Sequence, residues 1–312
     1  MNGCLIGGAV ILVLWILASM KKSRPDGVYL AATHKFRKMM PYLMRGRNES
    51  VVYFDSYVNA EPLLDYLKND VPADWNVDIT HAVVAASAIG MHENPSMNRF
   101  VVGRRLYQRK GVFLTFSMKR KKLDRSSKVA ISKVESFPQD TFEDFAKRMG
   151  GNIQIERSDQ KTYVDKELDL FLLFPRPFLV ALTGLVRTLD YYNLLPKMFI
   201  DGDQMYTSMV VANLGSLNMG AGYHHLYEWG TCPLFLMVGK IEERPVVEDG
   251  QVVVRKTLHL RYSYDERIDD GLNARFGIDS VARVLADPKK YLGCVAQDGS
   301  DRFAFLSPDK RD

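Results

Sequence analysis

The stretch from Tyr262 to Pro288 constrains the fold most, because it changes from one periodicity to another within a few residues. Apolar and polar residues alternate up to Tyr264, which is the pattern of a half-buried strand. From Leu272 the apolar residues recur near helical spacing until Pro288 ends the run. A polar turn at 265–271 lies between the two, and turns held by rigid elements commonly carry functional groups. The sequence therefore predicts a strand, a functional turn and a helix, in that order.

This turn resembles the end of the catalytic domain of 2-oxoacid dehydrogenase acyltransferases, within the chloramphenicol acetyltransferase-like superfamily. The family has Ser-x-Asp-His-Arg-x-x-Asp-Gly here, followed by a helix that ends in Asp-Pro. Two upstream stretches, 212–216 and 236–247, also resemble the family. The resemblance implies an α/β fold in which helices flank a mixed sheet. The residues that match the turn are Ser263, Asp265, Arg267, Asp270 and Gly271.

The two chemical positions of the family pattern carry different residues in this chain. Glu266 stands where the family has its general-base His, and Ala212 stands where the family has the Ser that stabilises the oxyanion. A Glu with a pKa of about 4.3 is poorly matched to a thiol with a pKa near 8.5. Burial can raise the pKa of a carboxyl by several units. Glu266 is therefore either a retuned base or the mark of a site that no longer turns over.

The resemblance also implies roles for four further residues. Asp270 is expected to hold the turn through an arginine such as Arg267. Asn213, or a backbone amide near it, is expected to replace the missing hydroxyl at the oxyanion. With Gly215 and Arg267, Asn213 makes up the set of residues expected to bind the thiol carrier.

A loop with two adjacent histidines offers a substitute for the missing imidazole. His224 and His225 lie among aromatic residues. One of them is either the general base or a structural loop histidine, because residues distant in sequence can converge in a fold. Adjacent histidines are a poor joint metal site without further ligands, and no metal site is expected. Further along, Asp249-Gly250 between apolar alternations predicts a hairpin turn.

The N-terminus carries an uncharged run from Gly3 to Met20, about the length that crosses a hydrocarbon core. Lys21, Lys22 and Arg24 follow it directly. Because positive charge marks the cytoplasmic side, residues 1–24 are expected to form a transmembrane anchor with the main domain in the cytoplasm. The sequence thus predicts a single-pass membrane protein.

Four segments make up the predicted domain organisation. A basic juxtamembrane segment covers 25–49, an acyltransferase-like domain covers 50–292, and a polar tail covers 293–312. A hydrophobic insertion at about 165–200 interrupts the domain. It is interpreted as two short helices at a bilayer, as a lid over an apolar acyl tunnel, or as buried helices that enlarge the core.

Several classes of function are not expected. The formal net charge of +5 comes from local runs such as Lys119–Lys122 with Arg125 and Lys128, and no nucleic-acid-binding motif accompanies them. The three cysteines make no metal or redox pattern. No room exists between the anchor and the domain for a lipoyl domain.

Two functions follow from these observations. The first is a membrane-anchored, cytoplasm-facing acyltransferase that moves an acyl group to or from a thiol carrier, with a coenzyme A thioester as co-substrate. The alternative is a non-catalytic member of the family that acts as a binding or scaffold protein. For both, the resemblance implies a homotrimer, with active sites between subunits.

Overall fold

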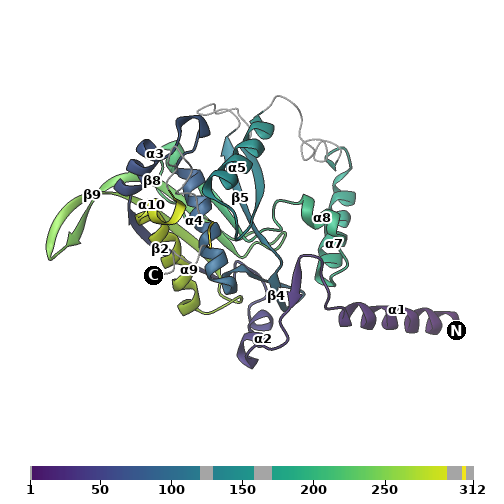
Figure 1. Ribbon diagram of the computed structural model, residues 1–312. Coiled ribbons are helices and arrows are strands. Elements are labelled where there is room, and N and C mark those ends of the chain that lie inside the picture. The colour runs from purple at the N-terminus through teal and green to yellow at the C-terminus, as the bar shows by residue number, and fades with distance from the viewer. Residues whose placement is uncertain (1, 120–128, 158–170, 294–303, 307–312) are drawn as a thin grey trace.

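The computed structural model of the chain describes residues 2–119, 129–157, 171–293 and 304–306 (Figure 1). The basic run beyond Lys119, the first residues of the predicted insertion and most of the predicted polar tail lie outside the described residues.

The described chain forms two sheets and a set of helices. The strands are β1 (Gly27–Tyr29), β2 (Val51–Asn59), β3 (Arg99–Val102), β4 (Arg105–Arg109), β5 (Val112–Lys119), β6 (Val129–Ser136), β7 (Met209–Asn213), β8 (Leu234–Glu248) and β9 (Gln251–Asp265). The α-helices are α1 (Asn2–Met20), α2 (Lys35–Leu43), α3 (Glu61–Asn69), α4 (Ile79–Glu93), α5 (Phe142–Arg157), α7 (Arg176–Tyr191), α8 (Lys197–Gly202), α9 (Gly271–Ala286) and α10 (Pro288–Leu292). Short 3-10 turns are η1 (Ala73–Trp75), η2 (Pro95–Asn98) and η3 (Gly215–Leu217).

The larger sheet has six strands in the order β2-β9-β8-β7-β5-β6. Strand β7 pairs in parallel with both β5 and β8, and the other neighbours are antiparallel. The smaller sheet has the order β1-β4-β3 and joins the N-terminal segment to the body. The prediction of a mixed α/β sheet flanked by helices is therefore confirmed.

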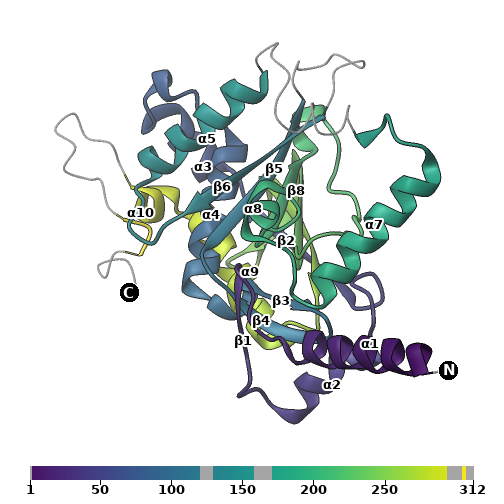
Figure 2. The same ribbon diagram turned by 90° about the vertical axis from the view of Figure 1, so that its right-hand side faces the viewer.

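Helices α4, α5 and α9 pack against one face of the large sheet (Figure 2). Every residue of α4 from His81 to Met91 is buried, so this helix forms the centre of the main core. The helix begins where Asp78 accepts hydrogen bonds from the amides of Thr80 (2.9 Å) and His81 (3.2 Å). An N-terminal cap of this kind supplies acceptors that the first turn otherwise lacks.

The opposite face of the sheet is covered by the segment between β7 and β8. On this face lies the second apolar cluster of the protein, in which residues of the strands pack with Ala221 and Leu226 of that segment. Ala212 belongs to this cluster together with Phe235 and Met237 of β8. The loop that contains the two histidines thus lies over the sheet face that carries Ala212.

The predicted hairpin turn is confirmed at the end of β8. Glu248 pairs with Gln251, and both turn residues have positive φ angles, 50° at Asp249 and 76° at Gly250. Two positive φ angles are the requirement of a two-residue turn that matches strand twist. The β8–β9 ribbon extends beyond the rest of the sheet (Figure 1). Its valines Val247, Val252 and Val254 are exposed there.

The predicted transmembrane anchor at residues 1–24 is wrong, and so is the single-pass membrane localisation. Across the part of the chain that the structure describes, no helix is long and apolar enough to cross a membrane. The end of α1 is instead tied to the protein, because the Arg105 guanidinium donates to the Ser19 and Lys21 carbonyls.

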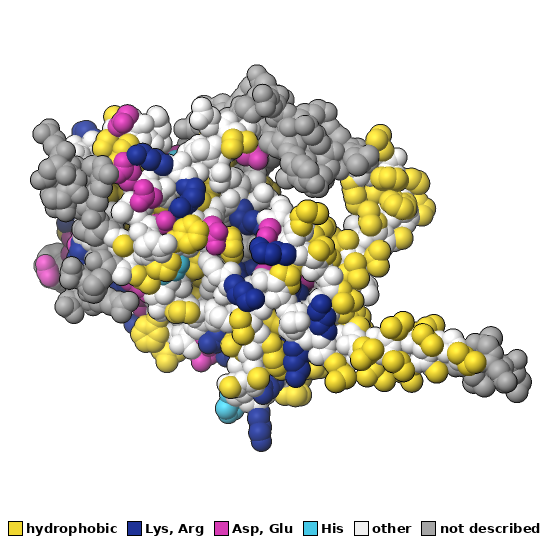
Figure 3. Space-filling view, turned by 45° about the vertical axis from the view of Figure 1, so that its right-hand side comes forward, with side chains coloured by type: hydrophobic (Ala, Val, Ile, Leu, Met, Phe, Trp, Pro, Cys, Tyr) yellow, Lys and Arg dark blue, Asp and Glu magenta, His cyan; other side chains and the backbone are white. Residues whose placement is uncertain are grey.

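Helix α7 lies on the surface of the protein. None of its residues is buried, and Phe178, Val180 and Leu185 are among its exposed apolar side chains. Helix α7 therefore gives no support to the interpretation of this insertion as buried helices, although Leu195 and Ile200 further along the insertion are buried in a small apolar cluster. The space-filling view shows apolar side chains gathered along the projecting α1 and on the neighbouring surface (Figure 3). Trp15 of α1 donates a hydrogen bond to the Tyr192 hydroxyl just after α7, at 3.0 Å.

We expect Gly277→Ala to destabilise the protein by about 1–3 kcal/mol, the usual cost of overpacking a core. A Cβ at Gly277 in α9 would lie 1.5 Å from the Met97 sulfur, and Met97 is itself buried. Chemical denaturation measures the loss. Gly184→Ala in α7 is the matched control, because no atom lies within 4 Å of its added Cβ. The control should be neutral or gain up to ~1 kcal/mol from helix propensity, and equal stability of the two variants would contradict the packing argument.

Candidate functional site

The turn after β9 is built on a buried ion pair between Asp265 and Arg267. Asp265 is fully buried, and its carboxylate accepts from Arg267 Nε at 2.8 Å and Nη2 at 2.7 Å. It also accepts from the Ser50 hydroxyl at 2.9 Å. The remaining Arg267 nitrogen, Nη1, donates to the carbonyls of Met44 (3.2 Å) and Arg45 (3.1 Å). The turn is therefore fixed to the N-terminal segment that precedes β2.

Glu266 lies between these two residues and is held by its backbone. Its amide donates to the Ser50 carbonyl at 3.0 Å, and its carbonyl accepts from Arg37 Nη1 at 2.6 Å. The side chain is half-buried, and its carboxylate makes no hydrogen bond or ion pair with any described residue. The structure thus holds the backbone of Glu266 rigidly and leaves its carboxylate available.

Asp270 is exposed and caps α9. Its carboxylate accepts from the Asn273 amide at 3.0 Å. The arginine expected to pair with it, Arg267, is bonded to Asp265 instead. The neighbouring Asp269 forms the ion pair to the rest of the protein, with Arg99 at 3.1 Å. Asp270 therefore contributes to the turn by starting the helix that follows it.

The two histidines lie side by side over β8. The His224 ring stacks on Phe235 with 3.9 Å between ring centroids, and on His225 with 4.9 Å. Burial lowers the pKa of His224 from its ordinary value. Its Nδ1 lies 2.7 Å from the His225 carbonyl, which can only accept a hydrogen bond. Nδ1 therefore carries the proton, and Nε2 bonds to no residue that the structure describes.

Asn213 lies on the sheet face opposite to Ala212. Its Nδ2 donates to the Thr80 hydroxyl of α4 at 3.0 Å, and its Oδ1 accepts from the Ser216 amide at 3.1 Å. Both ends of the amide are thus engaged on the helix side. Gly215 follows at a close backbone approach, where a Cβ would lie 2.5 Å from the Gly239 carbonyl oxygen. These two residues shape the loop after β7.

The Glu266 and Ala212 positions are far apart within one chain. Ala212 pairs with Met237, and Met237 pairs with Arg261 of β9. A strand advances about 3.3 Å per residue. Glu266 therefore lies roughly 16 Å further along β9 than the row of Ala212. The two positions cannot act on one substrate within a single chain.

An Asp-His-Arg network lies on the same sheet face as Ala212, and the sequence did not point to it. Asp55 of β2 accepts from His259 Nε2 at 2.9 Å and from Arg261 Nε at 2.7 Å. The hydrogen bond from Arg261 is the largest cause that lowers the pKa of Asp55. Tyr57 stacks on the His259 ring at 4.3 Å. The signal was available only in the alternation of β2 and β9, because the three residues meet through strand pairing.

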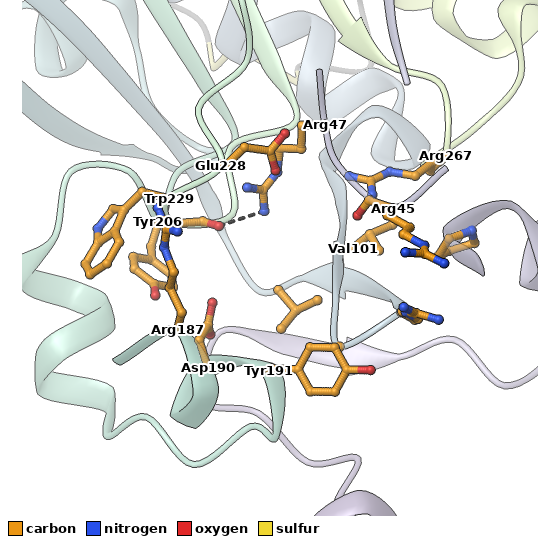
Figure 4. Close-up of a pocket in the computed structure, with 15 residues that line it drawn as sticks. Arg45, Arg47, Val101, Arg187, Asp190, Tyr191, Tyr206, Glu228, Trp229 and Arg267 are labelled. Atoms are coloured by element: carbon orange, nitrogen blue, oxygen red, sulfur yellow. Dashed lines mark hydrogen bonds between the residues drawn. The ribbon is translucent and has the colours of Figure 1, made fainter. Parts of the chain in front are cut away.

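A second set of residues that the sequence did not bring together lines a pocket of about 360 Å³ (Figure 4). Five arginines reach it from the segment after α2, the β3–β4 turn, α7 and the turn after β9. Arg267 belongs to this lining, whereas Glu266 does not. The arginines are Arg45, Arg47, Arg104, Arg187 and Arg267. In the described residues, no group of three or more His, Cys, Asp or Glu is arranged to hold a metal ion.

Comparisons with known proteins agree with this architecture. Residues 203–293 match the family model of the 2-oxoacid dehydrogenases acyltransferase (catalytic domain). The dihydrolipoyllysine-residue succinyltransferase component of the 2-oxoglutarate dehydrogenase complex from Cupriavidus necator is 46% identical over 57 residues. That alignment covers 18% of this chain and 14% of the relative's own length. The match is thus confined to the segment around the turn.

Solved structures extend the likeness in fold to most of the chain. The truncated catalytic core of the 2-oxoacid dehydrogenase multienzyme complex from Thermoplasma acidophilum superposes with a TM-score of 0.53 at 13% identity, covering 84% of this chain and 99% of that one. A chloramphenicol acetyltransferase gives 0.51 at 11% identity, covering 83% and 99%. Residues 203–293 therefore match the catalytic domain of the 2-oxoacid dehydrogenase acyltransferases, and most of the chain shares the fold of these solved structures.

We expect Asp265→Asn to destabilise the protein by about 3–5 kcal/mol, because it leaves the buried Arg267 guanidinium without its counter-charge. Urea denaturation measures the change. Asp279→Asn is the matched control, since Asp279 forms an exposed pair with Arg275 at 3.2 Å. Surface pairs of this kind contribute at most about 0.5 kcal/mol. Similar losses in the two variants would show that the Asp265 pair does not hold the turn.

Proposed function

We propose that this protein transfers an acyl group to or from a thiol carrier such as coenzyme A, with Glu266 as the general base. The observation that carries the proposal is the state of Glu266. It occupies the general-base position of the family turn, its backbone is held on both sides, and its carboxylate makes no bond to a described residue. A base needs both a fixed position and an unengaged lone pair.

The reaction is a thiol exchange at an acyl carbonyl. The Glu266 carboxylate removes the thiol proton as sulfur attacks the carbonyl carbon and forms a carbon–sulfur bond. The tetrahedral intermediate then collapses, the bond to the departing sulfur breaks, and the proton passes from Glu266 to that sulfur. A carboxylate is a weaker base for a thiol than an imidazole is, so the expected turnover is slow.

The acyl oxyanion has no side-chain hydroxyl at the Ala212 position. The Asn213 amide is bonded to Thr80 and Ser216, so a backbone amide of the loop after β7 is the remaining donor. Loss of one oxyanion donor typically costs two to three orders of magnitude in rate. This too is consistent with slow catalysis.

The site is completed between subunits of a homotrimer. The separation of Glu266 and Ala212 along the sheet supports this arrangement, because only another copy can bring the two positions to one substrate.

A non-catalytic binding protein is the second candidate, and it has its own observation. Ala212 carries no donor, and the Asn213 amide is already engaged. A chain that keeps the fold without these groups is suited to hold a thioester without cleaving it.

We expect Glu266→Gln to lower kcat about 100-fold or more with little change in KM, because general-base catalysis contributes 10²–10⁴ in rate. The measurement is release of free thiol by the full chain from a panel of acyl-coenzyme A donors, with dihydrolipoamide among the acceptors. Glu243→Gln, an exposed glutamate on β8, is the matched control and should retain full activity.

A double change, His224→Ala/His225→Ala, separates the two possible bases. Full activity in Glu266→Gln together with loss in the histidine variant would move the base to the loop over β8. If the folded chain binds the donors and releases no thiol with any acceptor, the acyltransferase proposal fails and the binding protein replaces it.

A further inference from the structure

The arginine-lined pocket carries more positive charge than the protein itself neutralises. Its lining holds five arginines and two carboxylates, Asp190 and Glu228. Asp190 is already paired with Arg24, which lies outside the lining, at 2.9 Å. Glu228 accepts from the amide of Asn48 at 3.0 Å and from its Nδ2 at 3.1 Å. Glu228 keeps its negative charge beside Arg47, whereas Asp190 is shared with Arg24, so the two carboxylates offset only part of the charge of the five arginines.

Among the five arginines, Arg267 is neutralised by Asp265. The buried Arg47 donates to the carbonyls of Tyr227 at 2.9 Å and Gly230 at 2.7 Å, so its charge is solvated by dipoles and not paired with a carboxylate within ion-pair distance (Figure 4). The guanidinium groups of Arg45, Arg104 and Arg187 form no ion pair with any described residue. A pocket with this balance favours an anion.

The elements that carry two of the unpaired arginines, Arg104 and Arg187, pack directly against each other. Gly103 and Arg104 form the β3–β4 turn with φ angles of 56° and 58°. A Cβ at Gly103 would lie 2.2 Å from the Tyr191 carbonyl oxygen, so the turn packs directly against the end of α7. Arg187 and Tyr191 lie four residues apart on α7 and share one face of that helix. The turn and α7 therefore bring Arg104 and Arg187 to the lining of one pocket.

We propose that this pocket binds a phosphate monoester that carries a planar apolar group. Arginine forms paired hydrogen bonds with phosphate and carboxylate oxygens. The arginines approach from several separate elements, which suits the oxygens of a tetrahedral dianion better than the single plane of a carboxylate. Tyr191 and Trp229 in the lining provide aromatic surface for the planar group (Figure 4). The volume of about 360 Å³ fits a small molecule.

This proposal goes beyond acyl transfer and does not depend on it. Ten of the lining residues, Arg45, Arg104 and Arg187 among them, lie outside the segment 203–293 that matches the acyltransferase family. Binding can therefore be measured whether or not the chain turns over a thioester.

The test is isothermal titration of the full chain with three probes: phenyl phosphate, inorganic phosphate and benzoate. Phenyl phosphate should bind at least about tenfold more tightly than either of the others, because it alone combines the dianion with a planar ring. Its affinity should rise between pH 5 and pH 7.5, since a phosphate monoester gains its second charge near pH 6. Added salt should weaken binding by screening the arginines.

Single changes assign the binding to the pocket. Arg187→Gln and Arg104→Gln should each weaken phenyl phosphate about tenfold, the usual effect of losing a hydrogen bond to a charged group. Arg176→Gln is the matched control, because Arg176 is an exposed arginine at the other end of the same helix α7. It should leave the affinity unchanged.

Three results would overturn the proposal. The first is the absence of phenyl phosphate binding to the folded protein. The second is equal affinity in wild type and in both pocket variants, which would place the anion elsewhere. The third is benzoate binding as tightly as phenyl phosphate, which would assign the pocket to carboxylates.

Discussion

The buried pair of Asp265 and Arg267 is the interaction on which the candidate site depends. A fully buried carboxylate is tolerated only when hydrogen bonds and a counter-charge replace the water that it loses. Asp265 obtains these from Ser50 and Arg267, and Arg267 in turn holds the carbonyls of Met44 and Arg45. One ion pair thus connects the end of β9, the start of α9 and the segment before β2. The position of Glu266 is a consequence of that connection.

The two faces of the large sheet differ in the residues that they carry. The face toward α4 and α9 is a closed apolar core with no room for a substrate. The other face carries Ala212, the Asp55 network and the histidine loop, and it contains polar groups that a core would exclude. The departures from the family pattern at Ala212 and Glu266 therefore lie on this face and at the end of the sheet, outside the main apolar core.

Local periodicity predicted the elements that depend on neighbouring residues. The strand that ends at Asp265, the helix that ends before Pro288 and the Asp249-Gly250 turn all follow from spacing and turn chemistry over a few residues. The family turn also identified Glu266 as the residue at the base position. The sequence could not predict which distant residues meet in the fold. Asp265 finds its partner Ser50, and Asp55 finds His259, only through strand pairing and long-range packing.

The N-terminal prediction failed for a different reason. It rested on the absence of charge between Gly3 and Met20, whereas a membrane span also requires sufficient length and apolarity. The described part of the chain holds no helix that meets both requirements. The apolar stretch before Tyr191 forms the exposed helix α7. Pro175 and Pro177 indicate where this helix begins, but they do not indicate what it packs against.

The positive charge of the pocket comes mainly from the parts of the chain that lie outside the family segment. Arg45 follows α2, Arg104 occupies a tight turn and Arg187 lies on α7. The family turn contributes Arg267, whose charge is already satisfied. The segment that matches the family therefore contributes the rigid turn, and the segments outside it contribute the unpaired charge. Unpaired arginines in one pocket lining repel one another, and a bound anion would offset that repulsion. The arrangement is best understood as one that a ligand completes.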